Sequence, residues 1–144
     1  MDRGTKLRVK GAISEFRAAI WYMEQGYQIF FPSSDGGVVD FVAYKPGETP
    51  RLVQVKTAHW ITSSGHRYLQ LRIGRTRVID GVEKREWDPN RVEDHYDELF
   101  VVHENSLWRI KKEEFPPGKK TLYFDRGGSG RERMGYDSDD WKVQ

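Results

Sequence analysis

The sequence predicts an α/β or α+β domain with a central mixed β-sheet and flanking helices. Three observations support this fold class. An amphipathic helical pattern comes first, short β-rich segments separated by turn residues follow it, and 144 residues make one ordinary domain. A hydrophobic content of 37% is enough for a core, and a charged content of 32% leaves a very polar surface.

Residues 11–25 predict an amphipathic helix. Its apolar side chains recur at about 100° per residue and cluster on one side. They are Ala12, Ile13, Phe16, Ala19, Ile20 and Met23. Gly26 stands just past the last of these positions, where a glycine commonly ends a helix.

Three strands are predicted next, and a turn joins the second to the third. They cover residues 27–31, 38–44 and 51–57. Pro and Gly punctuate residues 45–50, so the second and third strands are expected to pair as an antiparallel hairpin. A fourth strand is expected at 68–73, after a polar loop over 59–67.

The C-terminal half is less regular. Residues 74–90 yield no clear element, whereas Asn90 and Glu93 have the spacing of a capping box and predict a short helix over 90–96. Further strands are expected at 98–103, 107–110 and 121–124. Gly-rich residues then favour a division into a domain of residues 1–124 and a polar tail of residues 125–144.

Charge is unevenly distributed along the chain, although the net charge is only +2. Residues 51–79 contain no Asp or Glu but carry Arg51, Lys56, Arg67, Arg72, Arg75 and Arg77. Such segregation gives one face the positive potential that binding a polyanion requires, and the alternative is a solvated basic surface with no partner.

Without cysteine, disulfides and thiolate metal sites are excluded. No secretory signal or membrane span is recognised, which favours an intracellular (cytoplasmic) protein without membrane contact.

Two neighbouring strands carry polar residues where apolar ones are expected. In the third strand Gln54 and Lys56 share one face, because side chains alternate along a strand. Asp40 interrupts the hydrophobic second strand, and a hairpin can bring it close to both. A buried charge is costly unless it is paired or bound to a metal. A structural ion pair between Asp40 and Lys56 is therefore the alternative to an active site.

With Glu15, at the flank of the helix's apolar side, these residues resemble the PD-(D/E)xK nuclease superfamily. The matching segments are residues 11–15, residues 39–42 and Gln54-Val55-Lys56. The resemblance covers about residues 10–124 and implies a restriction-endonuclease-like core. Gln54 stands where the motif has its second acid, and Val39 where it has Pro. The Gln variant is similar to the branch of cyanobacterial group I intron homing endonucleases, near the archaeal-type Holliday junction resolvases.

The resemblance implies a magnesium site, with Mn²⁺ able to substitute. Its ligands would be Asp40, Gln54, the carbonyl of Val55 and, for a second ion or a bound water, Glu15. Lys56 would orient or activate the attacking water, so the expected catalytic residues are Glu15, Asp40, Gln54 and Lys56. DNA would be gripped by His59, Arg67, Arg72, Arg75 and Arg77.

The expected function is a DNA endonuclease of the homing type, encoded by a bacterium, an archaeon or a phage, that cuts both strands. The alternatives are a junction-resolving nuclease for branched DNA, an inactive DNA-binding module on the same fold, and an oligomeric structural or phage-associated protein. Cutting two strands needs two active sites, so a homodimer or homotetramer is expected. Trp108, Phe115 and the segment around Trp141 are the candidate interface residues.

Overall fold

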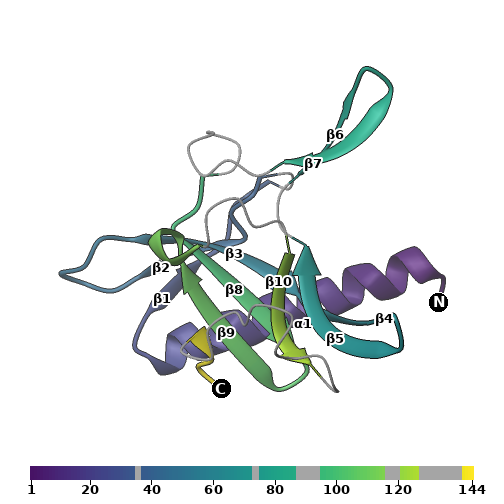
Figure 1. The fold of residues 1–144 in the computed structure, drawn as a ribbon. Coiled ribbons are helices and arrows are strands. Elements are labelled where there is room, and N and C mark those ends of the chain that lie inside the picture. Colours follow the sequence, from purple (N-terminus) through teal and green to yellow (C-terminus); the bar gives the residue numbers. More distant parts are fainter. Residues whose placement is uncertain (35–36, 73–74, 87–94, 116–120, 127–140) are drawn as a thin grey trace.

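A five-stranded mixed sheet forms the centre of the molecule, as predicted (Figure 1). The computed structural model describes residues 1–34, 37–72, 75–86, 95–115, 121–126 and 141–144. The sheet order is β1-β2-β3-β8-β9, and the strands are β1 (Gln28–Phe30), β2 (Phe41–Tyr44), β3 (Arg51–Thr57), β8 (Glu98–His103) and β9 (Ser106–Lys111). Only the β3–β8 pair within this sheet is parallel. The predicted β2–β3 hairpin is confirmed, with Phe41 opposite Val53.

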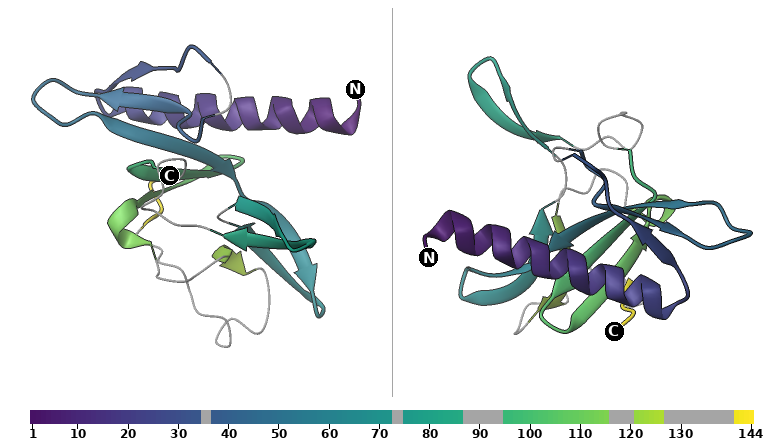
Figure 2. Two further views of the ribbon diagram at one scale, coloured as in Figure 1. Left: turned by 90° about the horizontal axis from the view of Figure 1, so that it is seen from above. Right: turned by 180° about the vertical axis from the view of Figure 1, so that it is seen from behind.

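One long helix, α1 (Arg3–Glu24), lies along one face of this sheet (Figure 2). It begins two turns earlier than expected, because Asp2 caps it by accepting a hydrogen bond from the Thr5 amide. The predicted apolar side was wrong. The buried residues are Ser14, Ala18, Ala19 and Tyr22, whereas Ile13, Phe16, Ile20 and Met23 are about half exposed. The small alanines let the helix approach the sheet closely, and Tyr22 fills the space between them and Phe41 and Phe100.

A second sheet covers the other face, and its order is β10-β5-β4. Its strands are β4 (His59–Ser63), β5 (His66–Arg72) and β10 (Thr121–Arg126). The prediction of a loop over 59–67 was therefore wrong, because the backbone of residues 59–63 pairs with β5 across a tight turn at Ser64 and Gly65. Leu69, Leu71 and Leu122 from this sheet form a core with Leu99, Val101, Trp108 and Ile110 of the central sheet.

Three smaller elements complete the described chain. The β6–β7 hairpin (Arg75–Ile79 and Val82–Glu86) stands away from the body in Figure 1. A 3-10 turn, η2 (Lys112–Glu114), follows β9. The last residues pack on β9, where the Val143 amide donates to the Leu107 carbonyl at 2.8 Å. The division of the chain at residue 124 stays a prediction.

Three further predictions from the sequence can be compared with the described residues. Residues 90–94 of the predicted second helix lie outside the described residues. The prediction that Trp108 and Phe115 lie at an interface is wrong, because they are 4% and 8% exposed and belong to the core. Trp141 is also buried, at 6%, whereas Lys142 and Gln144 of the same segment are exposed. Within the described residues, no helix combines the length and the apolar composition that crossing a bilayer requires.

Candidate active site

Strand pairing fixes Asp40 at the edge of the β2–β3 hairpin. Its amide donates to the Val53 carbonyl at 2.8 Å, which continues the β2–β3 ladder by one residue. Its carboxylate oxygen Oδ2 accepts a hydrogen bond from the Val55 amide at 2.6 Å. The predicted proximity of Asp40 to the third strand is thus confirmed, and the carboxylate lies against the residue between Gln54 and Lys56.

Glu15 and Lys56 are the charged neighbours of Asp40. Burial raises the pKa of Asp40, and three contacts oppose this increase: the Val55 amide, the positive charge of Lys56 and a hydrogen bond with the Glu15 side chain. Glu15 comes from α1 and is half-buried, so it meets Asp40 from the helix side. Two carboxylates in contact disfavour each other's ionised form, which favours a proton or a cation beside them. The arrangement therefore provides a place for positive charge.

A hydrogen bond between α1 and β3 holds Glu15 in this position. The hydroxyl groups of Ser14 and Thr57 are 2.7 Å apart, and Ser14 is only 4% exposed. Ser14 directly precedes Glu15, and Thr57 directly follows Lys56. One buried contact thus sets the helix position of the acid relative to the strand position of the lysine. This pair could not be predicted from the sequence, because a lone Ser and a lone Thr have many roles.

Gln54 is half-buried in the middle of β3 and shares a strand face with Lys56. Its Cα partner on the parallel strand is Leu99. The structure thus brings Glu15, Asp40 and Val55 together by hydrogen bonds, places Lys56 near enough for its charge to act on Asp40, and places Gln54 beside them in the chain. In the part of the chain that the structure describes, no three Asp, Glu, His or Cys side chains form a metal-binding group. A metal here would depend on two carboxylates, the Gln54 amide oxygen and a backbone carbonyl, which are all hard oxygen donors that suit Mg²⁺.

A cavity of about 590 Å³ lies beside this cluster. Its lining comes from α1, β3, β4 and β5: Gly11, Val55, Lys56, Thr57, His59, Ile61, Gln70, Leu71 and Arg72. Burial lowers the pKa of His59, and the positive charge of Lys10 adds to this effect. The sequence indicates Lys10 as part of a basic N-terminal cluster with Arg3, Lys6 and Arg8, and the structure brings it to this region. Sequence reasoning missed the buried Gln70.

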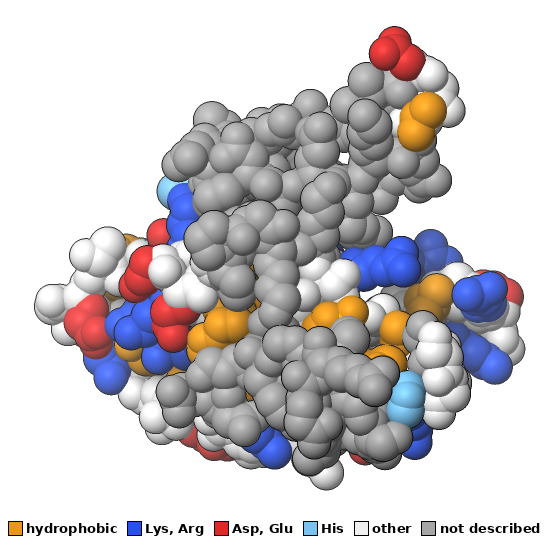
Figure 3. Space-filling view, viewed as in Figure 1, with side chains coloured by type: hydrophobic (Ala, Val, Ile, Leu, Met, Phe, Trp, Pro, Cys, Tyr) orange, Lys and Arg blue, Asp and Glu red, His pale blue; other side chains and the backbone are white. Residues whose placement is uncertain are grey.

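The expected DNA-binding residues fall into two groups. His59 and Arg72 line the cavity, and Arg67 is exposed with its guanidinium 4.3 Å above the Trp60 ring. Arg75 and Arg77 belong to β6, and their side chains lie outside the described residues. Figure 3 shows Lys and Arg gathered on the side of the molecule where the N-terminal part of α1 meets β4 and β5. The predicted segregation of charge is visible there, although DNA contact itself stays a prediction.

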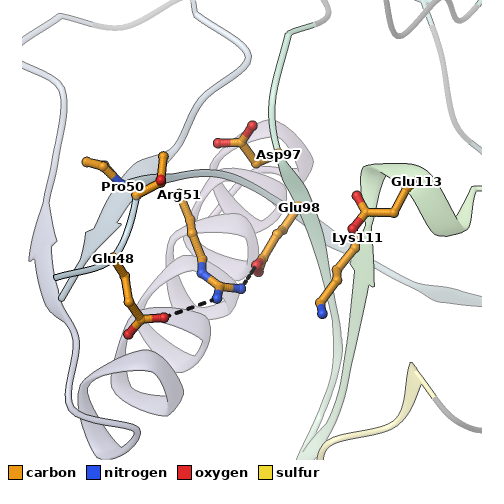
Figure 4. A pocket seen from close by; sticks show the side chains of 8 residues that line it. Glu48, Pro50, Arg51, Asp97, Glu98, Lys111 and Glu113 are labelled. Atoms are coloured by element: carbon orange, nitrogen blue, oxygen red, sulfur yellow. Dashed lines mark hydrogen bonds and ion pairs between the residues drawn. The ribbon is translucent and has the colours of Figure 1, made fainter.

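A second buried acid, Glu98, lies at the opposite end of β3 (Figure 4). Arg51 donates to its carboxylate at 2.5 Å, and Arg109 donates twice, at 2.7 and 2.6 Å. The Tyr22 hydroxyl also donates to it. Burial raises the pKa of Glu98, while the Tyr22 hydrogen bond and the charge of Arg51 oppose the increase. Since two guanidinium groups offset one carboxylate, this cluster is a structural ion network between α1, β3, β8 and β9.

Comparison with known proteins gives a likeness in structure but none in sequence. No family model matches the chain, and no curated protein matches it in sequence. Among solved structures, the chain is similar to a bacterial homing endonuclease, I-Ssp6803I, with a TM-score of 0.69. The two chains are 20% identical, and the match covers 94% of this chain and 87% of the other. At this identity the likeness establishes a shared fold, which is the α+β fold with a mixed sheet described above.

Proposed function

We propose that this chain is a Mg²⁺-dependent DNA endonuclease of the PD-(D/E)xK type, with homing-type cleavage of both strands as its activity. The observation that carries the proposal is the contact between Asp40 and Glu15 beside Lys56, next to a basic cavity. The fold shared with a bacterial homing endonuclease supports it. A catalytic centre of this kind would place a cation between the two acids and the negatively charged phosphate oxygens of the substrate.

Each residue of the cluster has a role in phosphodiester hydrolysis. Asp40, Glu15, the Gln54 amide oxygen and the Val55 carbonyl would hold the metal, for which Mn²⁺ could substitute. When bound, Mg²⁺ lowers the pKa of a coordinated water and offsets negative charge on the phosphate. The hydrogen bond from the Val55 amide fixes one oxygen of Asp40, so the other oxygen keeps a defined direction.

Lys56 would act on the substrate rather than on the protein. Its side chain is exposed, it lines the cavity, and its charge acts on Asp40. An ammonium group in this place can orient the attacking water and stabilise the charge that develops as the water oxygen bonds to phosphorus and the leaving oxygen departs. His59, Arg67 and Arg72, with Arg75 and Arg77 of the projecting hairpin, would hold the DNA backbone.

Gln54 favours one alternative. Replacing the second acid of the motif by an amide removes a negative charge from the donor set, so the metal would be held more weakly or depend more on Glu15. In the extreme case the chain would be an inactive DNA-binding module. Cleavage of branched DNA, as by a Holliday junction resolvase, is the other alternative that this fold and this cluster allow.

Nicking assays separate these possibilities. Supercoiled plasmid and a four-way junction are incubated with the full chain and Mg²⁺ or Mn²⁺, and EDTA serves as the metal-free control. Metal-dependent nicking of the plasmid is the expected result, and preferred cleavage of the junction would indicate a resolvase instead. If both substrates stay intact while the chain still binds them at physiological salt, the endonuclease proposal is wrong and the binding module is correct.

A further inference from the structure

The outward side of α1 carries a continuous apolar seam. Its residues, called here the α1 seam, are Val9, Ile13, Phe16, Ile20 and Met23, which are 44%, 45%, 60%, 50% and 51% exposed. They point away from the side of α1 that is buried on the sheet. The view from behind in Figure 2 shows α1 in front of the sheet, with no described element covering its outer side. The packed side of the helix therefore leaves a second apolar side without a partner within the described residues.

The spacing of the α1 seam is that of a helix that pairs with another helix. Its positions are separated by four, three, four and three residues, which is the repeat of the a and d positions in a coiled coil. Phe31 is 52% exposed and extends the patch, because its ring lies 6.3 Å from that of Phe16. Contiguous exposed apolar surface of this kind marks an interaction site.

Charges along α1 favour a second copy of the same helix, running in the opposite direction. The N-terminal half is basic, with Arg3, Lys6, Arg8 and Lys10, whereas the last turn contains Glu24 and no basic residue. A parallel pair would bring the two basic halves together, and like charges would repel. In an antiparallel pair with Phe16 against Ile20 of the partner, Lys10 lies beside Glu24 of the partner. Arg17 would lie near the two-fold axis, where its donation to its own Glu104 carbonyl holds it aside.

A groove beside the α1 seam suits the same arrangement. Its volume is about 120 Å³, and it lies between α1, the β8–β9 turn and the C-terminus. Its lining is Arg17, Ile20, Trp21, Glu24, Glu104, Asn105, Leu107 and Gln144. Phe16, the most exposed member of the seam, would reach the groove beside Ile20 of the other copy. Because a two-fold axis repeats the contact, each copy supplies one ring and one groove.

We propose that the α1 seam is a homodimer interface in which two copies of α1 pack antiparallel, with Phe16 of each copy against Ile20 of the other. Such a dimer would provide the two active sites that cleavage of two strands needs. The inference itself depends only on α1, so a chain that stays monomeric would overturn it whether or not that chain cuts DNA.

Sedimentation of the full chain at micromolar concentration provides the first test. The wild type should sediment as a dimer or a multiple of it, and Phe16→Glu and Ile20→Glu should shift it at least tenfold toward the smaller species. Val82→Glu is the matched control, because Val82 is equally exposed at 55% but lies on the projecting hairpin. Circular dichroism checks that each variant is folded. A monomeric wild type, or an equal effect of all three substitutions, would overturn the proposal.

Disulfide crosslinking between introduced cysteines tests the direction of the helices. Because the sequence contains no cysteine, only the introduced thiols can react. Ile13→Cys and Met23→Cys proteins are oxidised separately and as a mixture. An antiparallel pair predicts that the mixed disulfide forms at least several-fold faster than either homodimer, whereas faster self-crosslinking of each variant would reject that direction. Charge exchange adds a second readout: Lys10→Glu and Glu24→Lys should each weaken association, and the double variant should recover it. Additive weakening in the double variant would contradict the pairing.

Discussion

The two ends of β3 hold acids that are compensated in opposite ways. At the Arg51 end, two arginines and a tyrosine donate to the single carboxylate of Glu98. At the Lys56 end, the carboxylates of Asp40 and Glu15 are in contact, and the positive charge of Lys56 acts on Asp40. Burial raises the pKa of both Asp40 and Glu98, so desolvation alone does not distinguish the two sites.

The difference lies in the balance of charge. An acid held by two guanidinium groups is already paired, and its network can stabilise the fold without any ligand. Two carboxylates in contact disfavour each other's ionised form and favour a proton or a cation beside them, which is why we propose that end of the strand as the metal site. Burial of an acid is therefore a weak sign of function by itself, whereas contact between two acids is a stronger one.

Asp40→Asn tests this contrast with the largest expected effect. The amide keeps the size of the side chain but removes a charge from the proposed metal site, and we expect the rate of plasmid nicking to fall about 10³-fold. Stability should stay the same or increase, because the contact between two acids of like charge is then removed. Thermal unfolding measured beside the nicking rate checks both parts.

Asp97→Asn is the matched control for this variant. Asp97 accepts the Leu52 amide of β3 at 2.8 Å, as Asp40 accepts the Val55 amide at 2.6 Å, but it lies at the Glu98 end. Both substitutions alter a carboxylate that accepts one hydrogen bond from an amide of the same strand. Only the Asp40 variant should lose nicking, and an equal loss in both would mean that the contact to β3, rather than the charge, matters.

Glu98→Gln should produce the converse result. The amide removes the charged acceptor of Arg109 and the nearer of the two charged acceptors of Arg51, which keeps Glu48 at 3.5 Å. We expect a loss of about 2 to 3 kcal/mol in the free energy of unfolding. The melting temperature should fall by roughly 5 to 10 °C. At low temperature, the nicking rate of the folded protein should remain within about twofold of the wild-type rate. Lost nicking with unchanged stability would make Glu98 part of the active site and remove the contrast.

The sequence predicted the Lys56 end of β3 better than the Arg51 end, for a physical reason. Alternation of side chains and the turn over residues 45–50 define the β2–β3 hairpin, and the hairpin alone brings Asp40 to Val55. Glu15 depended on the family resemblance. Arg51, Arg109 and Tyr22 come from three elements, and only the folded chain brings them to Glu98. Their spacing in the sequence carries no signal of that network.

Hydrophobic periodicity alone does not identify the buried side of α1. Apolar residues occupy two sides of α1, and hydrophobicity favours the side with the larger residues. The sheet instead receives the side with Ala18, Ala19 and Tyr22, because small residues allow close approach and one aromatic ring fills the remaining space. In β4 the polar composition suggested a loop, but strand pairing depends on backbone groups that composition does not report. Both errors arise where tertiary packing decides between locally similar choices.

Gln54→Glu should sharpen the contrast by adding the missing acid. A third carboxylate adds one negative charge to the proposed metal site. The chain should therefore need about tenfold less Mg²⁺ for half-maximal nicking, which corresponds to about 1.4 kcal/mol of metal binding. Without metal, the added repulsion should lower the melting temperature, and Mg²⁺ should restore it. Magnesium titrations of nicking and of thermal unfolding measure both effects. An unchanged magnesium requirement would mean that residue 54 does not face the metal.

The smallest expected effect belongs to the Ser14–Thr57 contact, which positions Glu15 without being part of the proposed chemistry. Ser14→Ala and Thr57→Val each remove one hydroxyl of a 2.7 Å hydrogen bond, and a double-mutant cycle should give a coupling energy of about 1 kcal/mol. If the contact sets the distance between helix and strand at the active site, each variant should also lower the nicking rate several-fold at saturating Mg²⁺ and raise the magnesium requirement. A purely structural contact would change the melting temperature and leave both kinetic readouts unchanged. Together, the cycle and the kinetic readouts determine whether the proposed active site depends on the position of α1 or on β3 alone.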